Sequence, residues 1–388
     1  MANKKECPRF RFTDIYQFVS SLYGQDLHTK RVYSLANATL GVMSSAALGV
    51  QTIGAALASA RGLRAKHAVK QVDRLLSNQG INVWSTFVHW VPYLIGARKS
   101  VVLAMDWTDF DGDGHATIMI SMVTRHGRAT PLIWRTVEKN TLKNNRNAHE
   151  DDVLQHLHDV LPEDVQVTVL ADRGFGDQKL FTYLKNELGF DYVIRFRDNI
   201  YVKDAKGEQR KASAWVGKDG RARTLRNARV TAKDCSVNTV VCVKDKNMAH
   251  PWCLAASDAS ASARTLIKYY AKRWSIEPAF RDTKDLRFGM GMSQLRIGDT
   301  QRRDRMFLLN AFAIVLLTLL GAACEATGYD RYLKTNTVKT RTHSLFRQGC
   351  MIYDSIPNMP DKWLAPIMVA FEQLIQDHDN FADVYGFV

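Results

Sequence analysis

Cysteine is scarce in this sequence, and no two cysteines are spaced as a metal-binding or redox pair. Six cysteines are scattered through 388 residues, without any Cys-x-x-Cys motif. This spacing excludes a zinc ribbon and a thioredoxin-type site, and it is typical of reduced thiols in the cytosol. The phosphate-binding pattern Gly-x4-Gly-Lys-Ser/Thr is also missing, so we expect no nucleotide cofactor.

Long apolar runs are equally scarce, and Met306–Cys324 alone approaches the length of a membrane span. The basic residues before it resemble a cytoplasmic flank, which keeps a membrane-associated protein open as an alternative. The run is solitary, however, and contains Asn310 and Thr318. Because a large domain needs a core helix that is apolar on all sides, we predict a buried helix and no membrane association. The first twelve residues lack the apolar core of a signal peptide, so we expect a cytoplasmic protein.

The overall composition is that of a folded soluble protein with excess positive charge. Hydrophobic residues make up 46% and charged residues 24%, which excludes a wholly disordered chain. The length suggests two or three domains. Lys and Arg number 53 against 39 Asp and Glu, giving a formal net charge of +14. Such an excess favours a polyanionic partner, with nucleic acid ahead of an anionic membrane surface.

Residues 1–97 have the apolar spacing of helices. Apolar residues recur every three or four positions in 29–48, 50–59, 65–76 and 84–93. We therefore predict a helical DNA-binding domain over 1–97. An ordinary solvated helical face would give the same pattern, and that reading stays open. The basic residues of the segment are Lys30, Arg31, Arg61, Arg64, Lys66, Lys70 and Arg74.

The pattern changes near residue 98 to that of an α/β domain. We expect strands at 100–106, 116–123, 129–137, 165–171 and 190–196, with helices at 149–161 and 177–187. This order predicts a mixed five-stranded sheet covered by helices in a domain spanning 98–326. The polar segment 198–262 reads as an inserted β subdomain. Residues 327–388 read as a helical C-terminal region and a candidate for dimerisation.

Two carboxylates stand at the ends of predicted strands that should be neighbours. Asp106 ends the first strand and Asp172 the fourth. Carboxylates that converge at one sheet edge bind hard divalent cations, and two such cations can promote phosphodiester cleavage. Glu277 is the candidate third ligand. Its segment resembles a helix on which Tyr270, Arg273, Glu277 and Lys284 share one face, unless Pro278 kinks the helix or starts a second one. An exposed face stabilised by an Arg273–Glu277 pair is the alternative.

The spacing Tyr270-x2-Arg273-x3-Glu277-x6-Lys284 resembles the signature of a known family. It is similar to that of the insertion-sequence-four family of bacterial DDE transposases, which includes the transposases of transposons five and ten. Met105-Asp-Trp-Thr108 and Ala171-Asp-Arg-Gly-Phe175 resemble the surroundings of the first and second catalytic aspartates of that family. The motifs cover about residues 98–290.

This resemblance implies a ribonuclease H-like catalytic domain with a β insertion before the glutamate. Asp106, Asp172 and Glu277 would form the catalytic triad and bind Mg²⁺, for which Mn²⁺ can substitute. The implied reaction is cut-and-paste transposition: water nicks the DNA, the freed 3′-OH forms a hairpin on the transposon end, and the reopened end joins target DNA. The implied partners are double-stranded DNA, as terminal inverted repeats and target, and a second subunit in a homodimer, which would place the protein at the bacterial nucleoid.

The resemblance also suggests residues that contact DNA. Arg273 and Lys284 would bind phosphates, and Tyr270 would hydrogen-bond a phosphate or stack on a base. Trp252 resembles the tryptophan that receives a flipped base, although a core tryptophan of the insertion is the alternative. Arg173 and Arg195 lie near the expected site and are candidates for phosphate contacts. A catalytically inactive DNA-binding regulator of transposon origin is the rival function, and the intact acidic trio argues against it.

Overall fold

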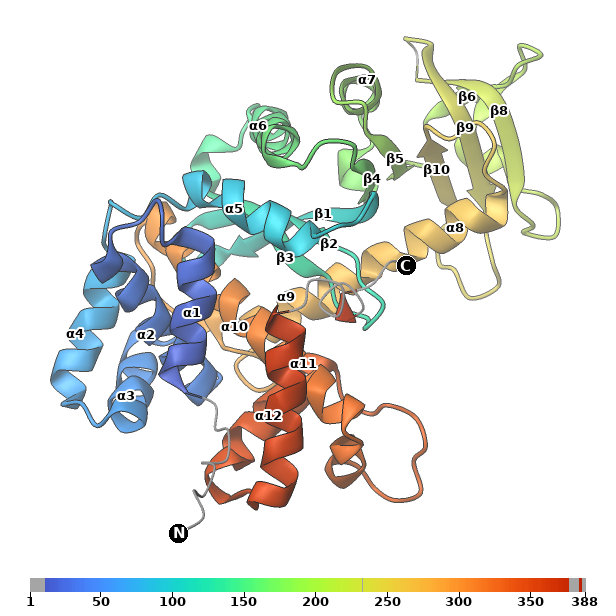
Figure 1. Ribbon diagram of the computed structural model, residues 1–388. Helices are drawn as coiled ribbons and strands as arrows, with labels where there is room; N and C mark the ends of the chain where they lie inside the picture. The colour runs from blue at the N-terminus through green and yellow to red at the C-terminus, as the bar shows by residue number, and fades with distance from the viewer. Residues whose placement is uncertain (1–10, 232, 377–383, 386–388) are drawn as a thin grey trace.

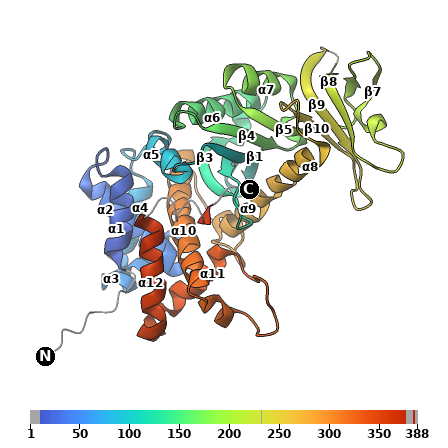
Figure 2. The same ribbon diagram turned by 45° about the vertical axis from the view of Figure 1, so that its right-hand side comes forward.

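The computed structural model describes residues 11–231, 233–376 and 384–385, so the N-terminal segment discussed above for targeting lies outside the described residues. A twisted sheet runs through the molecule (Figure 1). Helices from both ends of the chain gather at one end of this sheet, and the inserted strands extend away at the other. Figure 2 shows the same division from a second direction.

The N-terminal helices are α1 (Phe12–Tyr23), α2 (Thr29–Ser45), α3 (Val50–Arg61), α4 (Ala65–Leu76) and α5 (Val83–Ile95). The predicted helix at 29–48 ends earlier, at Ser45, because Ala46 adopts a left-handed conformation with φ of 46°. Gly54 lets α3 approach α4 closely, since a Cβ at this position would meet Val69 backbone atoms at 2.5 Å. The bundle is therefore tightly packed.

Five strands form the sheet predicted for the α/β region: β1 (Ser100–Phe110), β2 (His115–Met122), β3 (Thr130–Glu138), β4 (Gln166–Ala171) and β5 (Asp191–Phe196). Their order in the sheet is β3-β2-β1-β4-β5. The pairs β1–β2 and β2–β3 are antiparallel, whereas β1–β4 and β4–β5 are parallel. The helices α6 (Arg146–Val160) and α7 (Gln178–Thr182) complete the connections. A mixed sheet with covering helices is thus confirmed.

The prediction that the sheet has only five strands was wrong. The insertion contributes β6 (Tyr201–Lys203), β7 (Gln209–Lys211), β8 (Arg223–Val230), β9 (Cys235–Val243) and β10 (Trp252–Ala256). β10 pairs antiparallel with β5, and the sheet continues as β5-β10-β9-β8-β6-β7 to ten strands. The physical reason is that β5 would otherwise be an edge strand with unpaired backbone groups, which the insertion covers.

Helices form the rest of the chain: α8 (Ala263–Lys272), α9 (Ile276–Lys284), α10 (Thr300–Ala326), α11 (Leu345–Ser355) and α12 (Asp361–Gln376). By length and composition α10 could cross a membrane, but 94% of its apolar window is buried inside the protein. It packs against α2, α11, α12 and β3. The apolar run of the sequence is therefore a core helix in this fold, as predicted.

Candidate active site

The strand register aligns three polar side chains at one end of the parallel strands. Met105 of β1 pairs with Ala171 of β4, and Ala171 pairs with Ile194 of β5. The next residues along these strands are Asp106, Asp172 and Arg195. Side chains in register on parallel strands point to the same face of a sheet. The two aspartates are therefore neighbours, with the arginine beside them.

Helices α8 and α9 cover the face of the sheet to which these side chains point. Their apolar residues Leu266, Tyr270 and Ile276 form a buried cluster with Leu170 and Leu254 of the sheet. A short 3₁₀ turn over Arg273–Ser275 separates the two helices. This packing places Arg273 and Glu277 next to the end of β1.

The predicted helix is interrupted, but Arg273 still lies next to both Tyr270 and Glu277. The helix breaks at residues 273–275, before Glu277, and Pro278 lies in the first turn of α9, where a missing N–H is tolerated. Tyr270 is buried in the apolar cluster instead of lying on an exposed face. The alternative of a second helix starting near Pro278 is therefore correct, because α9 begins at Ile276.

Arg273 joins two of the three predicted catalytic carboxylates. Its Nη1 lies 3.3 Å from Asp106 Oδ2, and its Nη2 lies 2.9 Å from Glu277 Oε1. The arginine is only 6% exposed. Because a buried guanidinium needs anionic partners, this contact is a structural reason for Asp106 and Glu277 to face one another. The Arg273–Glu277 pair considered above therefore forms, but it is anchored in the interior.

Each aspartate is also held by a backbone N–H group. Asp106 Oδ1 accepts a hydrogen bond from the Trp107 amide at 2.8 Å. Asp172 Oδ1 accepts one from the Gly174 amide at 2.7 Å, and a Cβ at Gly174 would lie 2.9 Å from that oxygen. Both carboxylates are thus oriented by the chain that follows their strands.

Burial and like charges make this site electronegative. The pKa of Asp106 is raised to about 6, chiefly by burial; Arg273 lowers it, and the like charges of Asp172 and Glu277 raise it. One guanidinium therefore does not balance the carboxylates. A site of this kind stabilises an additional cation.

The donor set fits a hard divalent cation. Carboxylate oxygens are the ligands that Mg²⁺ and Mn²⁺ prefer, and Asp106 and Asp172 are adjacent in the sheet. Within residues 11–231, 233–376 and 384–385, no three His, Cys, Asp or Glu side chains are grouped closely enough to hold one ion. Glu277, which is paired with Arg273, would have to turn toward the aspartates to complete such a group.

The other predicted residues lie around this centre at different distances. Trp252 is half-buried, and its ring meets the Tyr270 ring edge-on with centroids 4.8 Å apart. Lys284, at the end of α9, contacts β1 beyond Asp106. Its Nζ is 3.0 Å from Thr108 Oγ1 and 2.7 Å from the Asp109 carbonyl oxygen. Arg173 is exposed, and with Arg195 it lines a cavity of about 460 Å³ that also contains Arg197 and His250.

Two arginines at the site have buried groups without a partner. The Nε atoms of Arg195 and Arg273 are buried and have no hydrogen-bond partner within the described part of the chain. Buried N–H groups are almost always hydrogen-bonded in folded proteins. An anionic ligand at this site would supply acceptors for both.

A contact that the sequence did not reveal clamps the end of β1. Trp107, which follows Asp106, donates from Nε1 to Glu150 Oε1 at 2.8 Å. The guanidinium of Arg146 lies 5.0 Å from the Trp107 ring. Glu150 is buried, and burial raises its pKa to about 7. Because Trp107 and Glu150 are separated by 43 positions, no local sequence pattern predicts their hydrogen bond.

We predict that this clamp positions Asp106. Glu150→Ala should lower DNA cleavage about 10- to 100-fold, because outer contacts of a metal ligand have effects of this size. Glu150→Gln should retain most activity, since its amide oxygen can still accept from the indole. Both variants should bind DNA normally in a gel-shift assay. Equal losses in the two variants would contradict a positioning role for the hydrogen bond.

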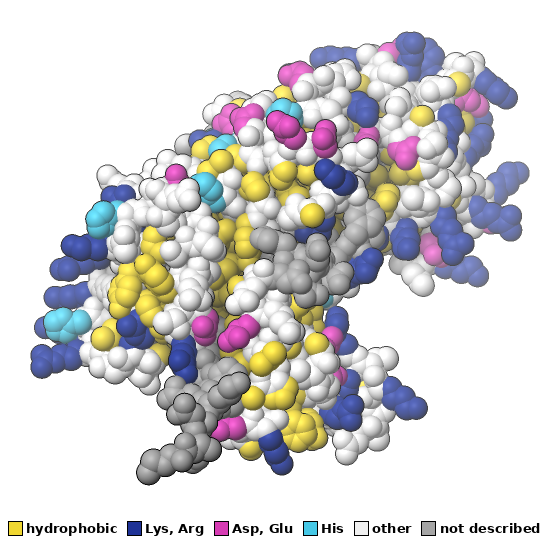
Figure 3. Space-filling view, in the orientation of Figure 1, with side chains coloured by type: hydrophobic (Ala, Val, Ile, Leu, Met, Phe, Trp, Pro, Cys, Tyr) yellow, Lys and Arg dark blue, Asp and Glu magenta, His cyan; other side chains and the backbone are white. Residues whose placement is uncertain are grey.

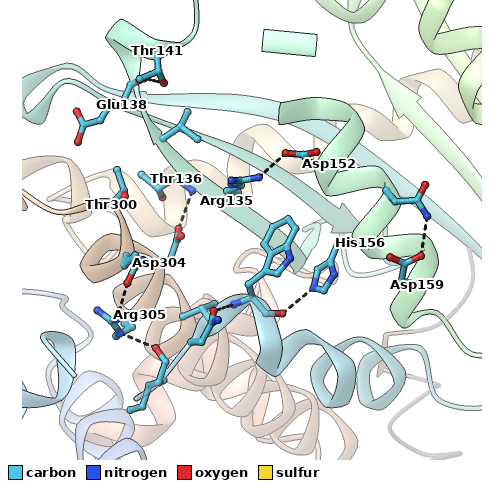
Figure 4. Close-up of a pocket in the computed structure, with 17 residues that line it drawn as sticks. Arg135, Thr136, Glu138, Thr141, Asp152, His156, Asp159, Thr300, Asp304 and Arg305 are labelled. Carbon is cyan, nitrogen blue, oxygen red and sulfur yellow. Dashed lines mark hydrogen bonds and ion pairs between the residues drawn. The ribbon is translucent and has the colours of Figure 1, made fainter. Parts of the chain in front are cut away.

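Another cavity is lined by none of the predicted site residues. This cavity of about 720 Å³ lies between α5, α6, β3 and α10 (Figure 4). Its charged groups are paired: Arg135 lies 2.9 Å from Asp152, and Asp304 accepts from the Thr136 amide. His156 contacts the Trp84 carbonyl oxygen at 2.8 Å. These contacts join the N-terminal helices to the sheet.

Comparison with known families identifies the class of protein to which this fold and site belong. A family model described as transposase DDE domain matches residues 97–316, more than half of the chain. The chain therefore belongs to the DDE transposase family. A search of curated proteins finds no match.

Proposed function

We propose that this chain is a cut-and-paste transposase of the insertion-sequence-four family, acting through a hairpin intermediate on the ends of its own element. The observations that support this proposal are that Asp106 and Asp172 follow paired residues of β1 and β4, and that Arg273 links Asp106 to Glu277. The strand order β3-β2-β1-β4-β5 supports a ribonuclease H-like core spanning 98–326, with the β insertion at about 198–262.

In this proposal each residue at the site has a defined task. Asp106, Asp172 and Glu277 would hold Mg²⁺, with Mn²⁺ as a substitute. When bound, this metal supplies activation of a water or 3′-OH and neutralises charge on the leaving oxygen. Arg273 and Arg195 would donate to DNA phosphates through groups that lack partners in the free protein. Trp252 would stack on an unpaired base, and Tyr270 would support its ring.

Lys284 and Arg173 would contact the DNA backbone beside the reacting phosphate. Burial lowers the pKa of Lys284, and its Nζ is already hydrogen-bonded to β1. Its task would therefore combine holding the end of β1 with a phosphate contact. Arg173, which directly follows Asp172 and is exposed, is free to move toward DNA.

The N-terminal helices would bind the element ends. A groove of about 560 Å³ between α2 and α4 is lined by basic side chains and, among the described residues, by no acidic one. Figure 3 shows Lys and Arg side chains gathered along this edge of the molecule. The groove therefore suits a phosphate backbone, and we assign DNA binding to residues 1–97. Its basic residues are Lys30, Arg31, Lys66, His67, Lys70 and Arg74.

The basic groove makes a prediction about salt. In Lys66→Ala/Lys70→Ala, the slope of log affinity against log salt should become less negative by about 2, because each lost phosphate contact changes it by about 0.9. Fluorescence anisotropy with duplex DNA at several salt concentrations measures this slope. The control Lys362→Ala, on α12, should leave it unchanged. An unaltered slope in the double variant would show that this groove does not bind DNA.

The proposed reaction can be tested directly. The protein would be incubated with Mg²⁺ and DNA carrying the ends of the element that encodes it together with flanking sequence. Hairpinned ends on a denaturing gel are the expected product. Binding without any metal-dependent nicking would instead support the rival function, a DNA-binding regulator. We further propose that two subunits pair two ends, with residues 327–388 as the dimerisation region, and that the protein acts at the bacterial nucleoid.

A further inference from the structure

Two large apolar side chains project into solvent just after helix α9. Leu286 is 71% exposed and Phe288 is 61% exposed, more than any other large hydrophobic residue in the described part of the chain. We call these two residues the apolar tip. Large apolar side chains held together in solvent mark an interaction site more often than isolated ones do.

The loop that carries the apolar tip is tightly held. Asp285 Oδ1 accepts hydrogen bonds from the amides of Arg287 at 2.8 Å and Phe288 at 2.6 Å. The Asp285 carbonyl oxygen accepts from Gly289 and Gly291. A Cβ at Gly289 would lie 2.3 Å from the Arg281 carbonyl oxygen, so only glycine fits there. The loop is therefore built to present its side chains outward and not to fold them back.

The apolar tip lies on the same helical arm as the candidate active site. Glu277 is in the first turn of α9, and Leu286 comes nine residues later, just beyond its end. At the rise of an α-helix this separation is about 13 Å. The same length corresponds to about four base-pair steps of duplex DNA. A duplex held at the carboxylates would thus lie within reach of the tip.

Positive charge surrounds the apolar tip. Arg281 and Arg287 are exposed, and the Arg287 guanidinium lies 5.1 Å from the centre of the Phe288 ring. Arg296, in the following segment, is 78% exposed. Cations that flank an apolar projection suit DNA, in which phosphates surround a stack of apolar base faces.

We propose that the apolar tip is a wedge that enters the DNA and separates neighbouring base pairs a few steps from the cleaved bond. This inference rests on the proposed function, because it requires DNA at the carboxylates. Arg281 and Arg287 contact the phosphates on either side, and Leu286 and Phe288 replace the base stacking that is lost. The wedge provides the sharp local distortion of DNA near the site of strand cleavage.

The test uses fluorescence of 2-aminopurine, which rises when the base is unstacked. A nicked DNA duplex of about four helical turns carries the probe at successive positions from the nick, and EDTA prevents cleavage. We expect a severalfold rise in the native protein at a position about four steps from the nick, distinct from any rise at the base that stacks on Trp252. Leu286→Ser/Phe288→Ser should lose this signal while its affinity changes less than about threefold, because phosphate contacts dominate affinity. The control Tyr201→Ser, which changes an exposed aromatic residue on β6, should keep the signal.

Failure of the wedge and failure of the proposed function are distinguishable. If the native protein binds the duplex but no probe position responds, or if the Leu286→Ser/Phe288→Ser variant gives the native signal, the wedge is overturned and the function stands. If the protein does not bind DNA, both are overturned. If this variant, without DNA, sediments as a smaller species than the native protein, the tip is a self-association surface, and the wedge is overturned.

Discussion

Replacing Asp106 by Asn is expected to abolish DNA cleavage and leave DNA binding within about threefold of the native value. The amide keeps the volume of the side chain but removes the charge that faces Asp172 and Glu277. Loss of a direct metal ligand should exceed the 10- to 100-fold effects of outer contacts, so we expect a decrease of at least about 10³-fold. A gel assay of nicked and hairpinned DNA measures it, and native-like cleavage would remove Asp106 from the mechanism.

The same substitution should stabilise the metal-free protein at high pH. The pKa of Asp106 in the folded state, about 6, lies above its ordinary value, so the folded protein binds this proton more tightly than the unfolded chain. Its contribution to stability is therefore greatest at low pH and is lost as the pH rises through about 6. At pH 8 the charged carboxylate destabilises the fold by about 3 kcal/mol, which Asp106→Asn should recover.

Denaturant titrations of both proteins in EDTA at pH 4 and pH 8 test this linkage. The gain in unfolding free energy should be present at pH 8 and nearly absent at pH 4. Asp219→Asn, which changes an exposed aspartate in the loop before β8, is a suitable control because it should show no such pH-dependent gain. An equal gain in unfolding free energy at both pH values would show that the charge of Asp106 does not destabilise the fold.

The sequence was sufficient to predict that Asp106 and Asp172 lie on neighbouring parallel strands, but the prediction that Asp106 ends its strand was wrong, because β1 continues to Phe110 in its pairing with β2. The register confirms that the two residues are adjacent. It was not sufficient for Arg273 and Tyr270. Helical periodicity places residues on a face but does not show which face is buried: Tyr270 packs into the core from α8, and a 3₁₀ turn follows at 273–275.

Contacts between distant segments also could not be predicted from the sequence. The strand β10 was expected in an insertion, but its antiparallel pairing with β5 is a long-range choice that residue patterns do not encode. The Trp107–Glu150 hydrogen bond likewise joins a strand to a helix on the face opposite the carboxylates. Lys284 was placed on the active stripe, whereas its hydrogen bonds are to Thr108 and Asp109 of β1.

Arg273→Ala should be the single change at the site that lowers the stability of the protein most. Removing the guanidinium leaves Asp106 and Glu277 facing each other without a counter-charge. Breaking a buried ion pair in this way costs about 3–5 kcal/mol, but Glu277 is half-exposed and its share is screened by solvent. We therefore expect a loss of about 2–3 kcal/mol in unfolding free energy, measured by urea titration in EDTA at pH 8.

A double-mutant cycle isolates the electrostatic part of this loss. If Arg273 is needed chiefly to neutralise Asp106, then Arg273→Ala should cost much less in an Asp106→Asn background, with a coupling of at least about 1 kcal/mol. Arg264→Ala, an exposed arginine on the same helix, should cost little in either background. Equal costs of Arg273→Ala in both backgrounds would show that its packing, and not its charge, stabilises the site. Arg273→Lys should restore part of the stability but little cleavage, because an ammonium cannot hold both carboxylates as the planar guanidinium does.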